Sequence, residues 1–421
     1  MPSSAAGPVH EVDTLVIGAG QAGLATSYWL SRAGVEHHLL ERRPELGGAW
    51  QDRWDSFYLN TPNFSFLLPE LTYDGPEPDA FLPRDEVIGL FRNYAARIAA
   101  PVLLGTEVTR VSAANGGFAV ETNHGRWQAR NVVLANGAFQ LPRIPAAAAA
   151  LPGHIRQLHS HDYRNPQQLP DGAVLVVGTG QSGGQITEDL LDAGREVHLS
   201  VSACPEAPRR YRGRDVFHWI LQVNLHGPEY GINGLQAEQL PSPAARFMCN
   251  PLISGNGGGH GIHLRDLGRR GVRLHGRFEG TDDGVLVFSG DLPTRLALVE
   301  AGFGARLGRM ADAYIHAAGI DAPPADPVPA DAWLPEDSGA RLDLAAEGVT
   351  SVIWSTGYGL DFGFLDIPVL DGWNYPRHSR GVTDVPGLYA VGLPWLTKHL
   401  SATLSVVGAD AEFVAGHIAA R

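Results

Sequence analysis

Lysine and cysteine are the residues that this chain has least of. Lys398 is the only lysine, so arginine supplies 31 of the 32 basic residues. The two cysteines, Cys204 and Cys249, lie far apart and form no Cys-x-x-Cys motif. The sequence therefore supports neither a disulfide framework nor a dithiol redox centre.

Basic residues are also too few to balance the acidic ones. The chain has 32 Lys and Arg against 45 Asp and Glu, a net charge of −13 and a pI near 5.7. This charge excludes nucleic acid and an anionic membrane surface as partners. Any phosphate group of a ligand must be bound by donors close to it.

An unbroken hydrophobic run is missing as well. Residues Thr14 to Ser31 are uncharged, but three glycines, Gln21 and hydroxyl residues interrupt them, and the acidic Glu11 and Asp13 precede them. A membrane helix needs a continuous apolar stretch, and a signal peptide begins with basic residues. We therefore expect a soluble, cytoplasmic protein.

Glycine is what the chain has in excess. There are 51 glycines in 421 residues, about 12% against a usual value near 7%. Many sharp turns or close approaches of backbone to a ligand are expected. With 44% apolar and 18% charged residues, the composition is globular, and the length predicts two or three domains.

Two segments read as a strand, a glycine-rich turn, a helix and a second strand, which is a βαβ unit. The first comprises 12–17, 18–23, 24–32 and 36–41. The second comprises 173–177, 178–184, 185–192 and 196–201. Between them, 102–121 and 126–134 alternate as small antiparallel strands do. Later segments are predicted as a strand at 349–355, a strand at 387–391 and a helix at 403–419.

The first glycine set is typical of a dinucleotide site. Gly18 allows a tight turn, Gly20 lets backbone amides approach a pyrophosphate, and Gly23 lets the helix pack on the strand. Gln21 lies within the same turn. Glu41 follows at the distance where an acid accepts hydrogen bonds from ribose hydroxyls.

The second glycine set repeats the pattern without the acid. Its residues are Gly178, Gly180, Gln181, Ser182 and Gly183. Val201 or Ser202 occupies the position of the acid, and a carboxylate there would repel a 2′-phosphate. Four nearby residues would favour one and hence NADPH over NADH: Ser200, Ser202, Arg209 and Arg210. The two arginines fit a solvated loop equally well.

Further motifs occur in a fixed order along the chain. They are Gly47-Gly48-Ala49-Trp50, Leu59-Asn60-Thr61-Pro62, Ala135-Asn136-Gly137, Ser355-Thr356-Gly357-Tyr358 and the segment 384–392, which ends at Gly392. With the two glycine sets, they resemble the class B flavin-dependent monooxygenases, which include the flavin-containing monooxygenases and the YUCCA-type enzymes. The family's fingerprint is only partly present, because His159 and Tyr163 fit it while Gly153 and Ile155 replace its Phe and Gly.

The resemblance implies an α/β fold of two doubly wound, Rossmann-like dinucleotide-binding domains, with the NADPH domain inserted into a discontinuous FAD domain. We expect the first part of the FAD domain at 1–150, the NADPH domain at 151–330 and the second part of the FAD domain at 331–421. Residues 141–152 are predicted as a hinge, 322–329 as a linker and 211–257 as an irregular insertion.

The implied activity is that of an NADPH- and O2-dependent monooxygenase acting on a small molecule. By this resemblance FAD forms a C4a-hydroperoxide, which oxygenates a nitrogen or sulfur atom or attacks a carbonyl, and Asn60 lies near flavin N5 as the catalytic residue. The residues around the flavin would include Gly48, Trp50, Thr61, Ala135, Gly137, Thr356, Gly357 and Gly392. Trp219, Trp395 and Lys398 are predicted, by elimination, to contact substrate, although the two tryptophans fit a core equally well.

Two alternatives stay open at this point. One is an NAD(P)H-dependent flavin reductase or oxidase that does not oxygenate a substrate, and the other is a non-catalytic FAD-binding protein. A metal site is not expected, because His154, His159 and His161 have no matching ligands at suitable spacing. The oligomeric state is open, with a homodimer as one option.

Overall fold

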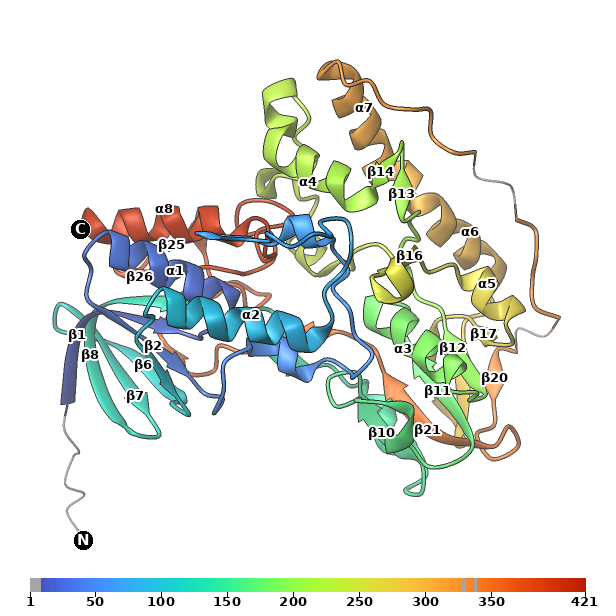
Figure 1. Ribbon diagram of the computed structural model, residues 1–421. Helices are drawn as coiled ribbons and strands as arrows, with labels where there is room; N and C mark the ends of the chain where they lie inside the picture. Colours follow the sequence, from blue (N-terminus) through green and yellow to red (C-terminus); the bar gives the residue numbers. More distant parts are fainter. Residues whose placement is uncertain (1–8, 328–330, 337–338) are drawn as a thin grey trace, which may run out of the picture.

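Each βαβ unit forms the centre of its own sheet, and the two sheets lie in separate lobes of the molecule (Figure 1). The computed structural model describes residues 9–327, 331–336 and 339–421. Residues 328 and 329 of the predicted linker lie outside the described residues. The predicted two-domain α/β fold is confirmed.

The first sheet has ten strands in the order β23-β6-β7-β8-β1-β2-β5, with β26, β25 and β24 attached through β8. The strands β1, β2, β8 and β26 run parallel, while β6, β7 and β8 form an antiparallel meander. The bounds are β1 (Val9–Ile17), β2 (His37–Glu41), β5 (Val102–Leu104), β6 (Val108–Ala114), β7 (Gly117–Thr122), β8 (Gly125–Leu134), β23 (Leu365–Asp366), β24 (His378–Ser379), β25 (Val382–Thr383) and β26 (Leu388–Ala390).

The second sheet is entirely parallel, in the order β10-β21-β11-β12-β17. Its strands are β10 (Arg156–His159), β11 (Ala173–Val177), β12 (Val197–Ser200), β17 (Arg273–His275) and β21 (Val349–Trp354). The strand β21 lies beyond the boundary that was predicted at residue 331, because its apolar residues pair with β10 and β11. The chain thus returns to the first domain after Trp354 and not before it.

The part of the chain that the structure describes contains eight α-helices, which cover the sheets or lie between them. They are α1 (Gln21–Arg32), α2 (Arg84–Arg97), α3 (Gln181–Asp192), α4 (Val216–His226), α5 (Leu264–Arg269), α6 (Leu292–Phe303), α7 (Arg309–Ala317) and α8 (Val407–Ala419). The helices α1 and α8 lie side by side over the first sheet (Figure 1). The indole N–H of Trp29 on α1 donates to the carbonyl of Gly408 on α8 at 3.1 Å.

Shorter elements complete the chain. The remaining strands are β3 (Leu67–Leu68), β4 (Leu71–Thr72), β9 (Leu141–Pro142), β13 (Arg210–Tyr211), β14 (Arg214–Asp215), β15 (Ile253–Ser254), β16 (His260–Gly261), β18 (Phe278–Asp282), β19 (Val285–Phe288), β20 (Arg341–Leu342) and β22 (Tyr358–Gly359). A π-helical turn, Gly304–Gly308, joins α6 to α7.

Two local predictions differ from the structure. Residues Val102–Leu104 pair parallel with β2 instead of joining the antiparallel meander. The segment predicted to be irregular contains the helix α4. Seven of its eleven residues are buried, and apolar side chains lie on most of its sides, so the sequence shows no clear helical period. Asp215 caps this helix by accepting a hydrogen bond from the amide of Phe217 at 2.8 Å.

The chain crosses between the domains twice, and the two crossings pair with each other. The strands β9 and β22 form an antiparallel ladder in which Tyr358 lies opposite Pro142. The amide of Arg143 donates to the carbonyl of Gly357 at 3.0 Å. Only the first two residues of the predicted hinge at 141–152 belong to this two-stranded ribbon, and Ala146–Ala150 form a 3₁₀ helix.

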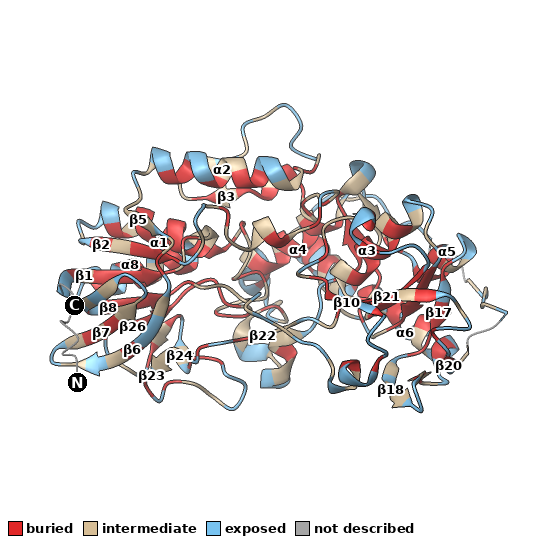
Figure 2. Ribbon diagram, turned by 90° about the horizontal axis from the view of Figure 1, so that it is seen from below, coloured by how far each residue is buried: buried red, intermediate tan, exposed pale blue. Residues whose placement is uncertain are grey.

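Packing continues from one domain to the other. Figure 2 shows buried residues along the strands of both sheets and along one side of α2. On α3, Asp189 accepts hydrogen bonds from Ser56 of the first domain and from the phenol of Tyr163, both at 2.6 Å. Tyr163 is fully buried. One carboxylate thus joins the first domain, the connecting segment and the second domain.

Replacement of Asp189 by alanine should destabilise the protein, because it leaves the buried Tyr163 hydroxyl without its acceptor. We expect the free energy of unfolding to fall by about 2 kcal/mol, as measured by urea denaturation. Asp192→Ala is the matched control on the same helix, since Asp192 pairs with Arg270 at an exposed position, and it should cost about 0.5 kcal/mol or less. Equal effects of the two substitutions would contradict this role of Asp189.

Candidate functional site

The first glycine loop joins β1 to α1 and is closed by backbone contacts. Gly18 has a φ of +105°, and a Cβ on it would lie 2.6 Å from the carbonyl oxygen of Ala135. A Cβ on Gly23 would lie 1.9 Å from the carbonyl oxygen of Gly18. Only glycine fits at either position, so the loop approaches both the neighbouring strand and its own helix as closely as a backbone can.

Gly20 differs from its two neighbours because the space in front of it is open. A Cβ there would have no atom of the protein within 4 Å. Gly20 is also the N-cap of α1, where unpaired amides and the helix dipole favour an anion. The open space therefore suits the pyrophosphate of a dinucleotide.

Glu41 closes the opposite side of this loop. It is buried, and its two carboxylate oxygens accept hydrogen bonds from the amides of Ala19, at 2.9 Å, and Arg43, at 3.0 Å. The predicted acid at the end of β2 therefore contacts the glycine loop directly.

The second glycine loop repeats this geometry between β11 and α3. Gly178 has a φ of +103°, and its Cβ would lie 2.6 Å from the carbonyl oxygen of Ser355. A Cβ on Gly183 would lie 1.8 Å from the carbonyl oxygen of Gly178, whereas one on Gly180 would have nothing within 4 Å. In both loops, therefore, backbone atoms lie against the first and the last glycine, whereas the middle glycine faces open space.

Ser202 takes in the second loop the place that Glu41 has in the first. The amide of Thr179 donates to the Ser202 hydroxyl at 3.2 Å, as the amide of Ala19 donates to Glu41. The hydroxyls of Thr179 and Ser202 lie 2.9 Å apart and share a hydrogen bond. A neutral hydroxyl therefore stands where the first site has a carboxylate.

The other residues predicted to favour a 2′-phosphate lie in different surroundings. Ser200 is buried and bonds to the carbonyl of Gly276 and the amide of Phe278, both at 3.0 Å. Arg209 forms a two-pronged pair with Asp215, at 2.7 and 2.6 Å. Arg210 is exposed. Ser200 and Arg209 are bonded inside the protein, whereas Arg210 is exposed and donates to the carbonyl of Gly213 at 3.0 Å, so Arg210 is the most accessible of the four to a phosphate in solution.

Asn60 connects the first domain to the second glycine loop. Its amide N–H donates to Gln181 at 2.9 Å, and its side-chain oxygen accepts from Gln185 at 2.6 Å. Its carbonyl accepts a hydrogen bond from Arg209 at 2.9 Å. The residue predicted as catalytic is therefore held from three directions at the junction of the two domains.

Several residues predicted around the first cofactor gather at the start of α1. A Cβ on Gly48 would come within 3.3 Å of the Cα of Gly20, and a Cβ on Gly392 within 2.4 Å of the Cβ of Ala22. Gln21 donates to the carbonyl of Ala402. The C-terminal segment around 392–402 thus lies against the start of α1, next to the first loop. Trp50, in the 3₁₀ helix Gly48–Asp52, and Thr61, beside Asn60, are both partly exposed.

The predicted turns at Ala135–Gly137 and Thr356–Gly357 lie where the chain leaves each sheet. Gly137 and Gly357 have φ values of +74° and +80°. His159 is bonded to the carbonyl of Gly357 at 3.0 Å, and burial lowers the pKa of its ring to about 4. This histidine is therefore neutral at physiological pH and serves the turn.

The guanidinium of Arg53 and the phenol of Tyr358 lie beside the turn at 356–357. Burial lowers the pKa of Arg53, although Tyr358 and Asp52 oppose the shift. Burial raises the pKa of Tyr358, and Arg53 opposes that shift. The Arg53 guanidinium also lies over the ring of Phe139 at 4.7 Å. Arg53 thus brings a positive charge into the junction between the domains.

The three residues predicted to contact substrate do not converge. Trp219 on α4 is buried, donates to the carbonyl of Tyr211 at 2.6 Å and lines a cavity of about 370 Å³ with Arg212, Arg214 and His218. Trp395 is buried among residues from α4 and the C-terminal segment, with a φ of +57°. Lys398 lies in that segment, where its charge acts on Asp410, a buried carboxyl whose pKa is raised by burial.

Sequence reasoning missed the polar residues of α3 that face the first domain. Gln185 and Asp189 are four residues apart and therefore lie on one face of the helix. Both make hydrogen bonds to the first domain, through Asn60 and Ser56. Two polar residues at this spacing in an otherwise buried helix are the signal that could have identified them. Among the described residues, no group of three metal-ligating side chains gathers and no helix is long and apolar enough to cross a membrane.

The difference between a glycine that lies against backbone atoms and one that faces open space can be tested by measuring the free energy of unfolding of two variants. Gly23→Ala should lower the free energy of unfolding by about 3 kcal/mol, because the added methyl group meets a backbone carbonyl. Gly20→Ala should change it by about 0.5 kcal/mol or less, because the methyl group enters open space. Urea denaturation of protein freed of bound nucleotide measures both, and a similar loss in the two variants would contradict the geometry.

Comparison with known proteins agrees with this arrangement. A family model described as pyridine nucleotide-disulphide oxidoreductase matches residues 15–220. An uncharacterised CzcO-like oxidoreductase of Geobacillus kaustophilus is 32% identical over 415 residues, which are 97% of this chain and 99% of that protein. The indole-3-pyruvate monooxygenase YUCCA1 of Oryza sativa is 29% identical over 280 residues, covering 65% of this chain and 66% of its own.

A solved structure is similar in fold over the whole chain. The flavin-containing monooxygenase from Stenotrophomonas maltophilia superposes with a TM-score of 0.63 and 22% identity, covering 98% of this chain and 99% of its own. Together with the paired glycine loops, these relatives identify an oxidoreductase built from two dinucleotide-binding domains. The chain belongs to the same family as the CzcO-like oxidoreductase of Geobacillus kaustophilus, and it resembles the class B flavin-dependent monooxygenases over part of its length.

Proposed function

We propose that this protein is an FAD-dependent monooxygenase that uses NADPH and transfers one oxygen atom of O2 to a small-molecule substrate, by N- or S-oxygenation or by attack at a carbonyl. The observation that carries the proposal is the pair of equivalent glycine loops, which differ at Glu41 and Ser202. Asn60 of the first domain is bonded to Gln181 of the second loop. Two dinucleotides held in this way can exchange a hydride.

The first loop is assigned to FAD. Its open glycine, Gly20, would admit the pyrophosphate, and Glu41 would accept hydrogen bonds from ribose hydroxyls. The C-terminal segment covers the loop through Gly392 and Gln21. A prosthetic group that remains bound through turnover needs such a cover.

The second loop is assigned to NADPH. Ser202 places no negative charge beside the ribose position, so a 2′-phosphate meets no carboxylate there. Arg210, eight residues further along the chain in β13, is exposed and can supply a positive charge. The net charge of −13 does not attract a phosphate. The preference between NADPH and NADH therefore depends on the residues close to the 2′-position of the ribose.

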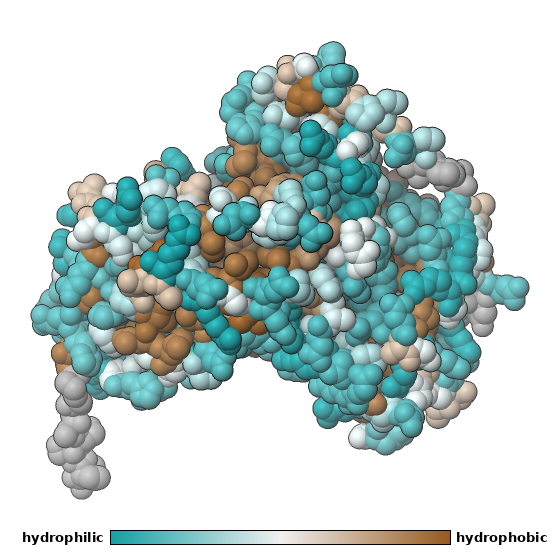
Figure 3. Space-filling model, viewed as in Figure 1, coloured by the Kyte–Doolittle hydropathy of each residue, from teal (hydrophilic) through white to brown (hydrophobic). Residues whose placement is uncertain are grey.

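The chain's own residues position the reaction. When bound, the nicotinamide supplies a hydride and the flavin accepts it and reacts with O2. Asn60 directs its amide from the first domain to the start of α3, where it orders the junction. Apolar surface gathers at the middle of the face in Figure 3, where the domains meet.

The proposal is tested by reducing the purified protein with NADPH under nitrogen and then admitting air. We expect NADPH to bleach the flavin, a transient absorbing species to form in air, and a product to gain one oxygen atom by mass spectrometry. Gly180→Val should abolish bleaching by NADPH but not by dithionite, because the side chain occupies the space of the nicotinamide nucleotide's pyrophosphate. Immediate return of oxidised flavin with stoichiometric peroxide would favour the flavin reductase or oxidase, and a lack of bleaching would exclude both enzymes.

The preference for NADPH depends on the missing carboxylate. Ser202→Glu should raise the KM for NADPH by about tenfold while leaving the KM for NADH similar or lower, because a carboxylate repels the 2′-phosphate and accepts ribose hydroxyls. Ala203→Glu is the control, since it adds the same charge at the next, exposed position. Steady-state kinetics with both cofactors measure the change, and a parallel rise for NADH would place the 2′-phosphate elsewhere.

A further inference from the structure

The two cysteines lie on neighbouring segments of the second domain, although 44 residues separate them along the chain. Cys204 follows β12, and Cys249 precedes β15. The amide of Leu252 donates to the carbonyl of Pro205 at 2.8 Å, and Leu252 forms a parallel bridge with Glu206. The Cys204 thiol donates to the carbonyl of Asn250 at 3.0 Å. The spacing of the two cysteines in the sequence supported no dithiol centre, so their proximity in the structure was not predicted.

The two thiols differ in exposure and acidity. Cys204 is buried and Cys249 is exposed. The contact between the two thiols lowers the pKa of Cys249, and the same contact together with burial raises the pKa of Cys204. Cys249 is therefore the thiol that ionises first and that an oxidant in solution can reach. Cys204 is the second, buried thiol of the pair.

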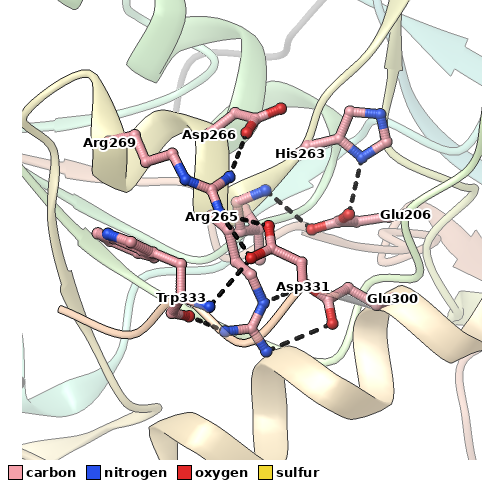
Figure 4. A network of polar contacts seen from close by, with 9 residues as sticks. Glu206, His263, Arg265, Asp266, Arg269, Glu300, Asp331 and Trp333 are labelled. Carbon is pink, nitrogen blue, oxygen red and sulfur yellow. Dashed lines mark hydrogen bonds and ion pairs between the residues drawn. The ribbon is translucent and has the colours of Figure 1, made fainter. Parts of the chain in front are cut away.

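The segment that carries Cys204 is firmly anchored. Two residues after it, Glu206 accepts a hydrogen bond from the amide of Leu264 at 2.8 Å and pairs with His263 at 2.9 Å. Figure 4 shows this carboxylate beside His263, next to the ion pairs of Arg265 and Arg269. The position of Cys204 is thus fixed by α5.

The segment that carries Cys249 lies against the second glycine loop. Gln181 of this loop donates to the carbonyl of Pro251 at 3.0 Å. A Cβ on Gly184 would lie 3.5 Å from the side chain of Leu252. Asn250 accepts a hydrogen bond from His399 of the first domain at 2.9 Å. Residues 249–252 therefore connect the loop at 178–183 to the C-terminal segment.

We propose that Cys204 and Cys249 form a redox-active thiol pair, which a hydroperoxide converts to a disulfide that fastens residues 249–252 over the second glycine loop. The Cys249 thiolate attacks the peroxide oxygen, which gives a sulfenic acid and releases water or an alcohol. The Cys204 sulfur then displaces water from that sulfenic acid, and the S–S bond forms. The two sulfurs lose two electrons in total, and the O–O bond is reduced.

The consequence for catalysis rests on the proposed function. A flavin monooxygenase that fails to transfer oxygen releases hydrogen peroxide, so the oxidant arises at the protein itself. The disulfide holds the cover of the NADPH loop in place and slows the exchange of the nucleotide. Oxidation would then reduce the consumption of NADPH when oxygen transfer fails.

The disulfide itself is tested on the purified full-length protein by peptide mass. The protein is treated with hydrogen peroxide, its free thiols are blocked with N-ethylmaleimide, and it is digested with trypsin. Cleavage after arginine places the cysteines on separate peptides, 196–209 and 247–265. We expect these two peptides to be linked, and dithiothreitol to separate them. Two blocked thiols and no linked peptide would overturn the proposal, whether or not the protein uses NADPH.

The regulatory effect is tested by kinetics on the same samples. We expect peroxide to slow the reduction of the flavin by NADPH by about tenfold, within the usual range of coupling between sites. Dithiothreitol should restore the rate, which excludes methionine oxidation as the cause, since that reagent does not reduce the sulfoxide. Cys249→Ser and Cys204→Ser should both make the rate insensitive to peroxide. A linked peptide with an unchanged rate would overturn the regulatory role but not the thiol pair.

Discussion

The carbonyl oxygens of Ala135 and Ser355 occupy the space that a side chain on Gly18 or Gly178 would need. Each oxygen belongs to the residue at which the chain leaves a sheet, directly before a turn that crosses to the other domain. The close approach of loop to strand therefore fixes two things at once, namely the conformation of a nucleotide-binding loop and the starting point of a crossing. The open glycine in the middle of each loop depends on the closed ones beside it, because they hold the amides of the helix N-terminus in place.

The polar groups at the domain junction are used mainly to join the domains. Arg209 was a candidate for binding phosphate, yet it is paired with Asp215 and bonded to the carbonyl of Asn60. Asp189 joins Ser56 and Tyr163 in the same way. A guanidinium or carboxylate that is buried with all its partners present stabilises one relative position of the two domains. In a protein with so high a negative charge, this leaves the recognition of phosphate to backbone amides and a few exposed arginines.

The sequence was sufficient where local geometry demands a particular residue. The glycine spacing and the strand before each loop predicted both strand-to-helix turns, and Glu41 contacts the first of them because its distance from the loop is set by one helix. The binding of nucleotides at these turns stays a prediction. The helix α4 was missed because a segment with apolar side chains on most of its sides has no clear period to detect. The extent of the second domain was also misjudged, since the pairing of β21 with β11 is a long-range contact that no local pattern records. The proximity of Cys204 and Cys249 has the same cause, because it depends on a bridge between distant segments.

The ribbon formed by β9 and β22 has a mechanical consequence. Because the two crossings are hydrogen-bonded to each other, neither can slide or lengthen alone, and the domains can turn only by twisting both strands as a unit. Each crossing begins at the carbonyl against which a glycine loop is wedged. A twist of this ribbon would therefore act on both glycine loops at once.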